Sequence, residues 1–165
     1  MLLKFTSKLS KKLKLSALPQ SQDYSGNFVE WYAHLFTANR VQYILTTEAK
    51  TLFSVVLYGR GITDDDIFIK DWLRFLSDYL SDIDRSRVFK TFIGPNTGQF
   101  RLAKTSSRSV LGSMNDMIST IKFTLQTEDL SPYDLSKMIN STPFKTIDYQ
   151  TPIACVDQLP YLRLI

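Results

Sequence analysis

The segment 104–116, KTSSRSVLGSMND, gathers more chemically useful side chains than any other stretch of this sequence. A strand is predicted to end near Lys104 and a helix to begin near Ser107. The first amides of a helix have no intrahelical acceptor and carry the positive end of its dipole, which suits them to bind a phosphate or carboxylate. The candidate ligand-binding residues are Lys104, Ser107, Arg108, Ser109, Ser113, Asn115 and Asp116.

Helical periodicity divides this segment into two faces. One is an apolar stripe that we expect to be buried, formed by Val110, Met114, Met117, Ile118, Ile121 and Leu125. The other is small and polar and includes Gly112, which costs up to about 1 kcal/mol in a helix relative to alanine. Two explanations remain open: a neighbouring element packs closely against Gly112 and Ser113, or a ligand approaches this face.

Catalysis by this segment is an alternative. Asn115 and Asp116 are of the types that a hydrolase or nuclease-like enzyme uses, with a divalent ion, but such a site needs a further carboxylate or the histidine nearby. With one histidine, His34, and one cysteine, Cys155, a zinc site of these two ligand types and a disulfide are excluded within one chain. We expect no metal and no cofactor.

The basic groups are unevenly distributed. The net charge is +4, and residues 1–60 and 87–122 are basic whereas residues 61–86 are acidic. If the two basic segments met on one face, they would attract nucleic acid. Aromatic residues on the predicted strands could then stack on bases, although alternation buries some of them; they are Trp31, Tyr32, Phe36, Tyr43, Phe53 and Tyr58.

Short connections between β-rich runs predict the sheet. The runs at 28–36, 41–46 and 52–58 are separated by only a few residues. A parallel crossover needs roughly a dozen residues, so these runs must be antiparallel neighbours. The sequence therefore predicts an antiparallel sheet of three to five strands, with a meander from Phe28 to Tyr58 and an edge strand near Gln99 to Lys104.

Helical periodicity and capping residues predict the remaining elements. One long helix begins near Asp64 and a second covers 107–126. A third begins at Ser131, followed by a first-turn proline, and ends near Asn140. These two long helices and shorter C-terminal helices pack on the sheet, so the fold class is α+β.

Length and composition favour one folded domain over residues 1–165, because a chain of 165 residues can bury a substantial core. No apolar run approaches the roughly 18 residues of a membrane span. The lysine-rich residues 1–15 lack the apolar core of a secretory signal, and we interpret them as a short strand followed by an amphipathic turn. The expected location is the cytoplasm, without membrane attachment.

The sequence also resembles an uncharacterised bacterial family of domains of unknown function. The similarity is carried by two segments. TLFS at 51–54 resembles a TLFSF-like strand of the family, and RSVLGSMND at 108–116 resembles a helix start of the family. The resemblance implies a stand-alone prokaryotic protein of the accessory or mobile genome. It implies no activity.

Taken together, these patterns leave the biochemical function open and favour a small, non-enzymatic binding or regulatory module. Its partner would be a protein or a small anionic ligand held at the helix start near Arg108. A hydrolase or nuclease-like enzyme using Asp116 and Asn115, and a nucleic-acid-binding protein using the two basic segments, are the alternatives.

Overall fold

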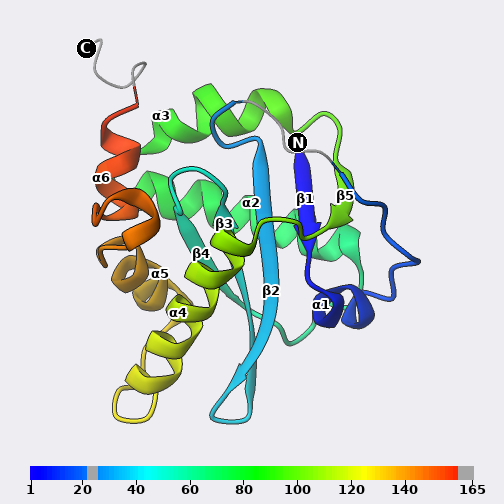
Figure 1. Cartoon of the computed structure of the whole chain (residues 1–165), viewed down its shortest axis with the longest axis horizontal. Helices are drawn as coiled ribbons and strands as arrows, with labels where there is room; N and C mark the ends of the chain where they lie inside the picture. Colours follow the sequence, from blue (N-terminus) through cyan, green and yellow to red (C-terminus); the bar gives the residue numbers. More distant parts are fainter. Residues whose placement is uncertain (22–25, 160–165) are drawn as a thin grey trace.

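The computed structural model describes residues 1–21 and 26–159, so residues 22–25 and 160–165 of the predicted domain lie outside this description. Its centre is a five-stranded sheet with the order β4-β3-β2-β1-β5, packed by helices on both faces (Figure 1). The strands are β1 (Leu2–Phe5), β2 (Glu30–Ala38), β3 (Val41–Glu48), β4 (Ser54–Tyr58) and β5 (Arg101–Lys104). The helices are α1 (Ser7–Lys12), α2 (Asp65–Asp82), α3 (Ser86–Val88), α4 (Arg108–Thr124), α5 (Pro132–Asn140) and α6 (Pro152–Asp157). The α+β class is confirmed.

The predicted meander is present. β2, β3 and β4 pair as antiparallel neighbours, from Trp31↔Glu48 to Ala38↔Val41 in the first pair. Asn39 and Arg40 alone connect β2 to β3, and both have positive φ, 47° and 67°. A two-residue hairpin turn of type I′ requires positive φ at both positions, and asparagine tolerates it well.

The expectation of a purely antiparallel sheet is wrong. β1 lies between β2 and β5 and is parallel to both, with Leu2 opposite Glu30 on one side and Arg101 on the other. The physical reason is the length of the connections: residues 6–29 separate β1 from β2 and include α1, which is enough chain for a parallel crossover. The predicted edge strand is at an edge, but beside β1 rather than beside the meander.

Helices cover both faces of the sheet because alternate strand residues point to opposite sides. On the face covered by α1 and α2, the strands contribute Leu3, Phe5, Trp31, Ala33, Leu35, Ile44, Val55 and Leu57. On the face covered by α4 and α5, they contribute Tyr32, Phe36, Ala38, Tyr43, Leu45 and Val56. Figure 1 shows α4 in front of the sheet, α2 behind it and α5 beside β4. The helix starts agree with the sequence, since Asp64, Ser107 and Ser131 each cap one.

A buried carboxylate organises the β3–β4 turn. Glu48 is fully buried, and its oxygens accept hydrogen bonds from the amides of Phe28, Lys50 and Thr51 and from the Thr51 hydroxyl, at 2.7–3.2 Å. Burial raises the pKa of the Glu48 carboxyl, and these hydrogen bonds oppose the rise. The side chain therefore satisfies backbone donors that the turn leaves without strand partners.

Side chains of α5 occupy the outer edge of β4. Asn140 accepts from the Ser54 amide (2.9 Å) and donates to the Ser54 carbonyl (2.7 Å), while the Ser136 hydroxyl accepts from the Val56 amide (2.9 Å). These contacts replace the strand that the edge lacks and block strand addition by another chain.

Among the described residues, no helix combines the length and apolar character needed to cross a bilayer.

Replacing Asn140 with alanine should destabilise the protein by about 2–4 kcal/mol, because buried backbone groups of Ser54 lose their partners. Urea denaturation followed by far-ultraviolet circular dichroism measures the change. Lys137→Ala, on an exposed position of the same helix, serves as the control and should shift stability by less than about 0.5 kcal/mol. Equal effects of the two substitutions would contradict this role for Asn140.

Candidate functional site

The start of α4 lies beside the sheet, after residues 105–107 cross from β5 in front of β1 and β2 (Figure 1). The Ser107 amide donates to the Tyr32 hydroxyl (3.2 Å), and the Ser107 hydroxyl accepts from the Val110 amide (3.3 Å). In the described part of the chain, the amides of Arg108 and Ser109 have no hydrogen-bond partner, and both residues are exposed. Half of the first four amides therefore remain available to an anion.

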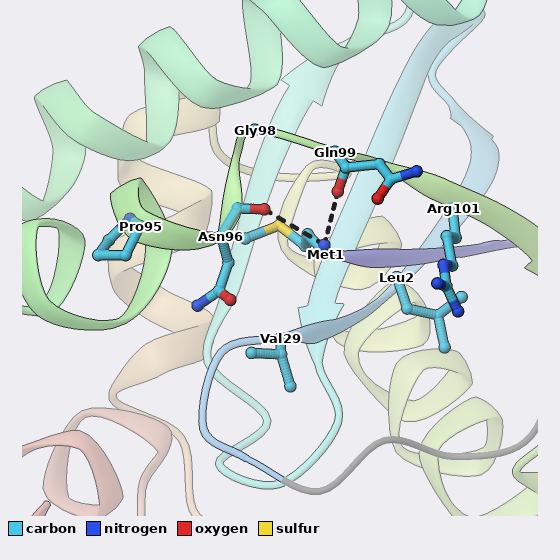
Figure 2. Close-up of a pocket in the computed structure, with 8 residues that line it drawn as sticks. All are labelled: Met1, Leu2, Val29, Pro95, Asn96, Gly98, Gln99 and Arg101. Atoms are coloured by element: carbon cyan, nitrogen blue, oxygen red, sulfur yellow. Dashed lines mark hydrogen bonds between the residues drawn. The ribbon is translucent and has the colours of Figure 1, made fainter.

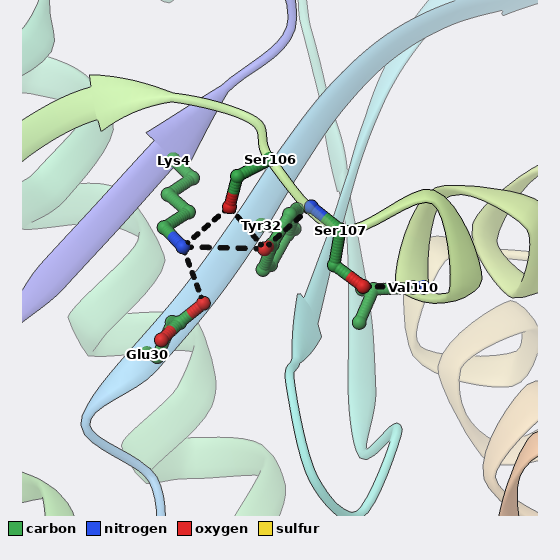
Figure 3. Close-up of polar contacts among 6 residues, drawn as sticks. All are labelled: Lys4, Glu30, Tyr32, Ser106, Ser107 and Val110. Carbon is green, nitrogen blue, oxygen red and sulfur yellow. Dashed lines mark hydrogen bonds and ion pairs between the residues drawn. The ribbon is translucent and has the colours of Figure 1, made fainter. Parts of the chain in front are cut away.

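A buried ion pair lies directly beneath this crossing. Figure 3 shows Lys4 of β1 reaching Glu30 and Tyr32 of β2 and Ser106 of the crossing segment. The Lys4 ammonium donates to Glu30 Oε1 and Ser106 Oγ at 2.7 Å each and to the Tyr32 hydroxyl at 3.3 Å. The Lys4 side chain is 0% exposed and that of Glu30 is 6% exposed.

Tyr32 connects this pair to the helix. Its hydroxyl accepts from the Lys4 ammonium and from the Ser107 amide, which leaves the phenolic proton for Ser106 Oγ, 3.2 Å away. The Lys4 Nζ also lies 5.3 Å from the centroid of the Tyr32 ring, within the range of a cation–π contact. Two strands and two residues of the crossing to α4, Ser106 and Ser107, are thus held by one hydrogen-bonded group.

The charges of this group largely cancel. Because Lys4 and Glu30 are in contact, the pair adds little net charge to the surface above it. The attraction for an anion at the α4 start therefore comes from the helix dipole, the two available amides and the exposed Arg108 guanidinium.

Two of the predicted site residues lie away from the helix start. Lys104 stands opposite Phe5 in the sheet and lines, with it, a hollow of about 290 Å³ beside α1, on the other face. Ser113 is buried, and its hydroxyl lies 2.7 Å from the Thr146 hydroxyl. Of the sequence-predicted residues, the structure brings together Ser107, Arg108 and Ser109.

Asn115 and Asp116 are also separate from the helix start. Both are exposed, and eight residues of helix put Asp116 about 12 Å along the axis from Arg108. Within the described residues, no three His, Cys, Asp or Glu side chains are placed to hold a metal ion. Of the two explanations for Gly112, a closely packed neighbour is not found among the described residues, since a Cβ built there would meet no atom of another element within 4 Å.

A hollow of about 510 Å³ lies where β1 and β5 begin, at the opposite end of these strands from α4 (Figure 2). The Met1 amine lines it and donates to the carbonyls of Asn96 and Gln99, at 3.2 and 2.7 Å. Burial, with a smaller contribution from Arg101, lowers the pKa of this amine. Because none of the predicted site residues lines this hollow, it is separate from the α4 start.

Sequence reasoning missed the buried group beneath the helix start. Lys4 and Glu30 entered the prediction only through the net charge of residues 1–60, although the sequence does indicate that Lys4 is buried. Lys4 alternates with Leu3 and Phe5 in a short strand, so it must face the other side of the sheet. If that side is also covered, a charged residue there needs a partner of opposite charge.

Replacing Lys4 with methionine should cost about 3–5 kcal/mol, because it leaves the Glu30 carboxylate buried without its cation. Guanidinium denaturation of Lys4→Met, Glu30→Met and the double variant measures this. The double variant should be more stable than Lys4→Met, and Lys8→Met, on the exposed face of α1, should behave as wild type. A double variant that simply adds the two single losses would refute the pairing argument.

Comparison with known proteins identifies a family for this chain. No curated protein and no solved structure matches the chain. A family model described as a domain of unknown function, DUF6933, matches residues 2–155 and so includes all five strands, the crossing segment and the whole of α4. The chain therefore belongs to the family of domains of unknown function DUF6933.

Proposed function

We propose that this protein is a small, non-enzymatic binding module that holds an anionic group at the start of α4. The group would be a phosphate or carboxylate of a small ligand or of a protein partner. The observation that carries the proposal is that two exposed residues, Arg108 and Ser109, have backbone amides without a hydrogen-bond partner in the described part of the chain. They adjoin the positive end of a helix of 17 residues.

The surrounding structure prepares this position. Ser107 and Tyr32 hold the first turn by their own hydrogen bonds, so the remaining amides keep one orientation before an anion arrives. Arg108 can add a bidentate contact to a phosphate or carboxylate. A binding role needs only these groups, whereas a hydrolytic role would need Asp116 to act about 12 Å away and without a metal-binding cluster in the described residues.

The expected affinity for a simple anion is low. A helix terminus at an exposed position contributes about 0.3–1 kcal/mol, and a charge-assisted hydrogen bond adds a similar or somewhat larger amount. Inorganic phosphate should therefore bind with a Kd in the millimolar range. Tighter binding by a natural partner would come from further contacts around this point.

Titration with inorganic phosphate at constant ionic strength, followed by amide nuclear magnetic resonance, tests the proposal. The Ser109 and Arg108 amide signals should move most, and chloride at equal ionic strength should leave them in place. Arg108→Gln removes the guanidinium but keeps the amide. Arg108→Pro removes both and is compatible with the first position of the helix and with the extended backbone of Ser107.

Binding should weaken in Arg108→Gln and weaken further in Arg108→Pro. Lys122→Gln, in the last turn of the same helix, is the matched control and should bind phosphate as the wild type does. If phosphate moves these amides no more than the rest of the spectrum, or if Arg108→Pro binds as well as wild type, the anion site does not exist.

A further inference from the structure

The strongest unassigned surface lies near the β4 edge of the sheet, where β3 begins and β4 ends. A hollow of about 740 Å³ is present there, within the range of roughly 300–1,000 Å³ that is typical of ligand pockets. Among the residues that the structure describes, its lining includes three cations, Lys12, Arg40 and Arg60, and no carboxylate. None of the three forms an ion pair with any described residue.

All three cations come from the first basic segment of the sequence, yet from three different elements. Lys12 ends α1, Arg40 is in the β2–β3 turn and Arg60 follows β4. The Lys12 ammonium donates to the Gln42 side chain (2.9 Å), which holds it at the start of β3. Gly59 allows the chain after β4 to pass close to β3: a Cβ there would lie 3.1 Å from that of Gln42. This approach brings Arg60 to the same hollow.

An aromatic ladder ends in this hollow. Phe36, Tyr43 and Tyr58 stand directly opposite one another on β2, β3 and β4. The ring centroids are 5.4 Å apart in the first pair and 5.6 Å in the second, with interplanar angles of 19° and 30°. Phe36 and Tyr43 are buried, whereas Tyr58 is 51% exposed. The other five expected stacking residues are therefore core, and Tyr58 is the one that presents its ring to solvent.

The ligand chemistry follows from this combination. A ring held at the end of a stacked column can accept one more planar ring, and three cations beside it attract phosphate. We propose that the hollow at Tyr58 binds a nucleoside phosphate unit, with the base stacked on Tyr58 and the phosphate near Lys12, Arg40 and Arg60. The unit can be a free nucleotide or one residue of a single-stranded nucleic acid.

A second hollow adjoins the first through Tyr58 and Arg60, which line both. It contains Asp71 and Asp78, and the Arg74 guanidinium within it is paired with Asp71 at 3.1 Å. These carboxylates repel phosphate. The phosphate of the ligand therefore lies in the first hollow. Because the second hollow disfavours a further phosphate, the proposed ligand is one base with its phosphate.

Isothermal titration with four probes tests this proposal: adenosine monophosphate, adenosine, ribose 5-phosphate and a deoxyadenosine decamer. The monophosphate should bind more tightly than adenosine or ribose 5-phosphate, because each of these lacks one of the two recognised groups. Tighter binding of the decamer than of the monophosphate would identify a strand as the source. Weaker binding of the decamer would identify the free nucleotide.

Variants distinguish stacking from general charge attraction. Tyr58→Val should lower affinity about tenfold, since base stacking on an aromatic side chain is worth roughly five- to 150-fold in affinity. Arg60→Gln should lower affinity and reduce its salt dependence. Phe123→Leu, which removes an exposed aromatic ring from α4, is the control and should leave binding unchanged.

Three results would overturn the proposal: no binding of either nucleotide probe at low salt, unchanged affinity in Tyr58→Val, or equal affinity for a hexaglutamate peptide. The last result would mean that the surface attracts acidic protein through charge alone. Folding of each variant is checked by its amide spectrum. The phosphate titration of α4 reports on different amides, so the two proposals can fail independently.

Discussion

The contact between Lys4 and Glu30 sets the conditions for the parallel half of the sheet. An unpaired charge at the centre of a packed sheet would cost several kcal/mol, so β1 can occupy that place only where a carboxylate and hydroxyls meet its lysine. β2 supplies Glu30 and Tyr32, and the crossing segment supplies Ser106. The position of β1, the path from β5 and the first turn of α4 are consequently linked by one group of hydrogen bonds.

The molecule contains two kinds of positive charge: one buried and paired, and others exposed at the surface. Lys4 is neutralised by its partner and acts within the structure, whereas Arg108, Lys12, Arg40 and Arg60 lie at the surface without ion pairs among the described residues. A formal net charge of +4 therefore understates how unevenly the surface potential is distributed. Of these four cations, Arg108 is at the start of α4, and the other three line the hollow beside Tyr58.

The sequence predicted the local structure well, because short-range rules decide it. The meander follows from its brief connections, and the caps at Asp64, Ser107 and Ser131 follow from side chains that bond the next amides. The parallel pairing of β1 could not be predicted, since hydrophobic alternation gives the faces of a strand and not its neighbours. For the same reason, the sequence did not indicate that Lys104 and Arg108, only four residues apart, lie on opposite faces of the sheet.

The site was only partly predictable, for a related reason. The start of α4 at its cap, Ser107, is a local feature and agrees with the prediction. The group around Lys4 depends on residues up to 102 positions apart and became apparent only with the register of three strands. The two residues expected to lie against a neighbouring element behave differently: Ser113 contacts Thr146, whereas no other element of the described chain comes within 4 Å of a Cβ built at Gly112.

The way α5 occupies the edge of β4 has a consequence for synthesis on the ribosome. Ser54 and Asn140 are 86 residues apart, and Val56 and Ser136 are 80 apart. The β2–β4 meander is therefore synthesised well before α5, and until α5 is made the outer edge of β4 has no hydrogen-bond partners. Likewise, the edge of β1 that pairs with β5 stays unpaired until β5 has been synthesised. Translation of the last third of the chain is thus the period in which chaperones would have most to protect.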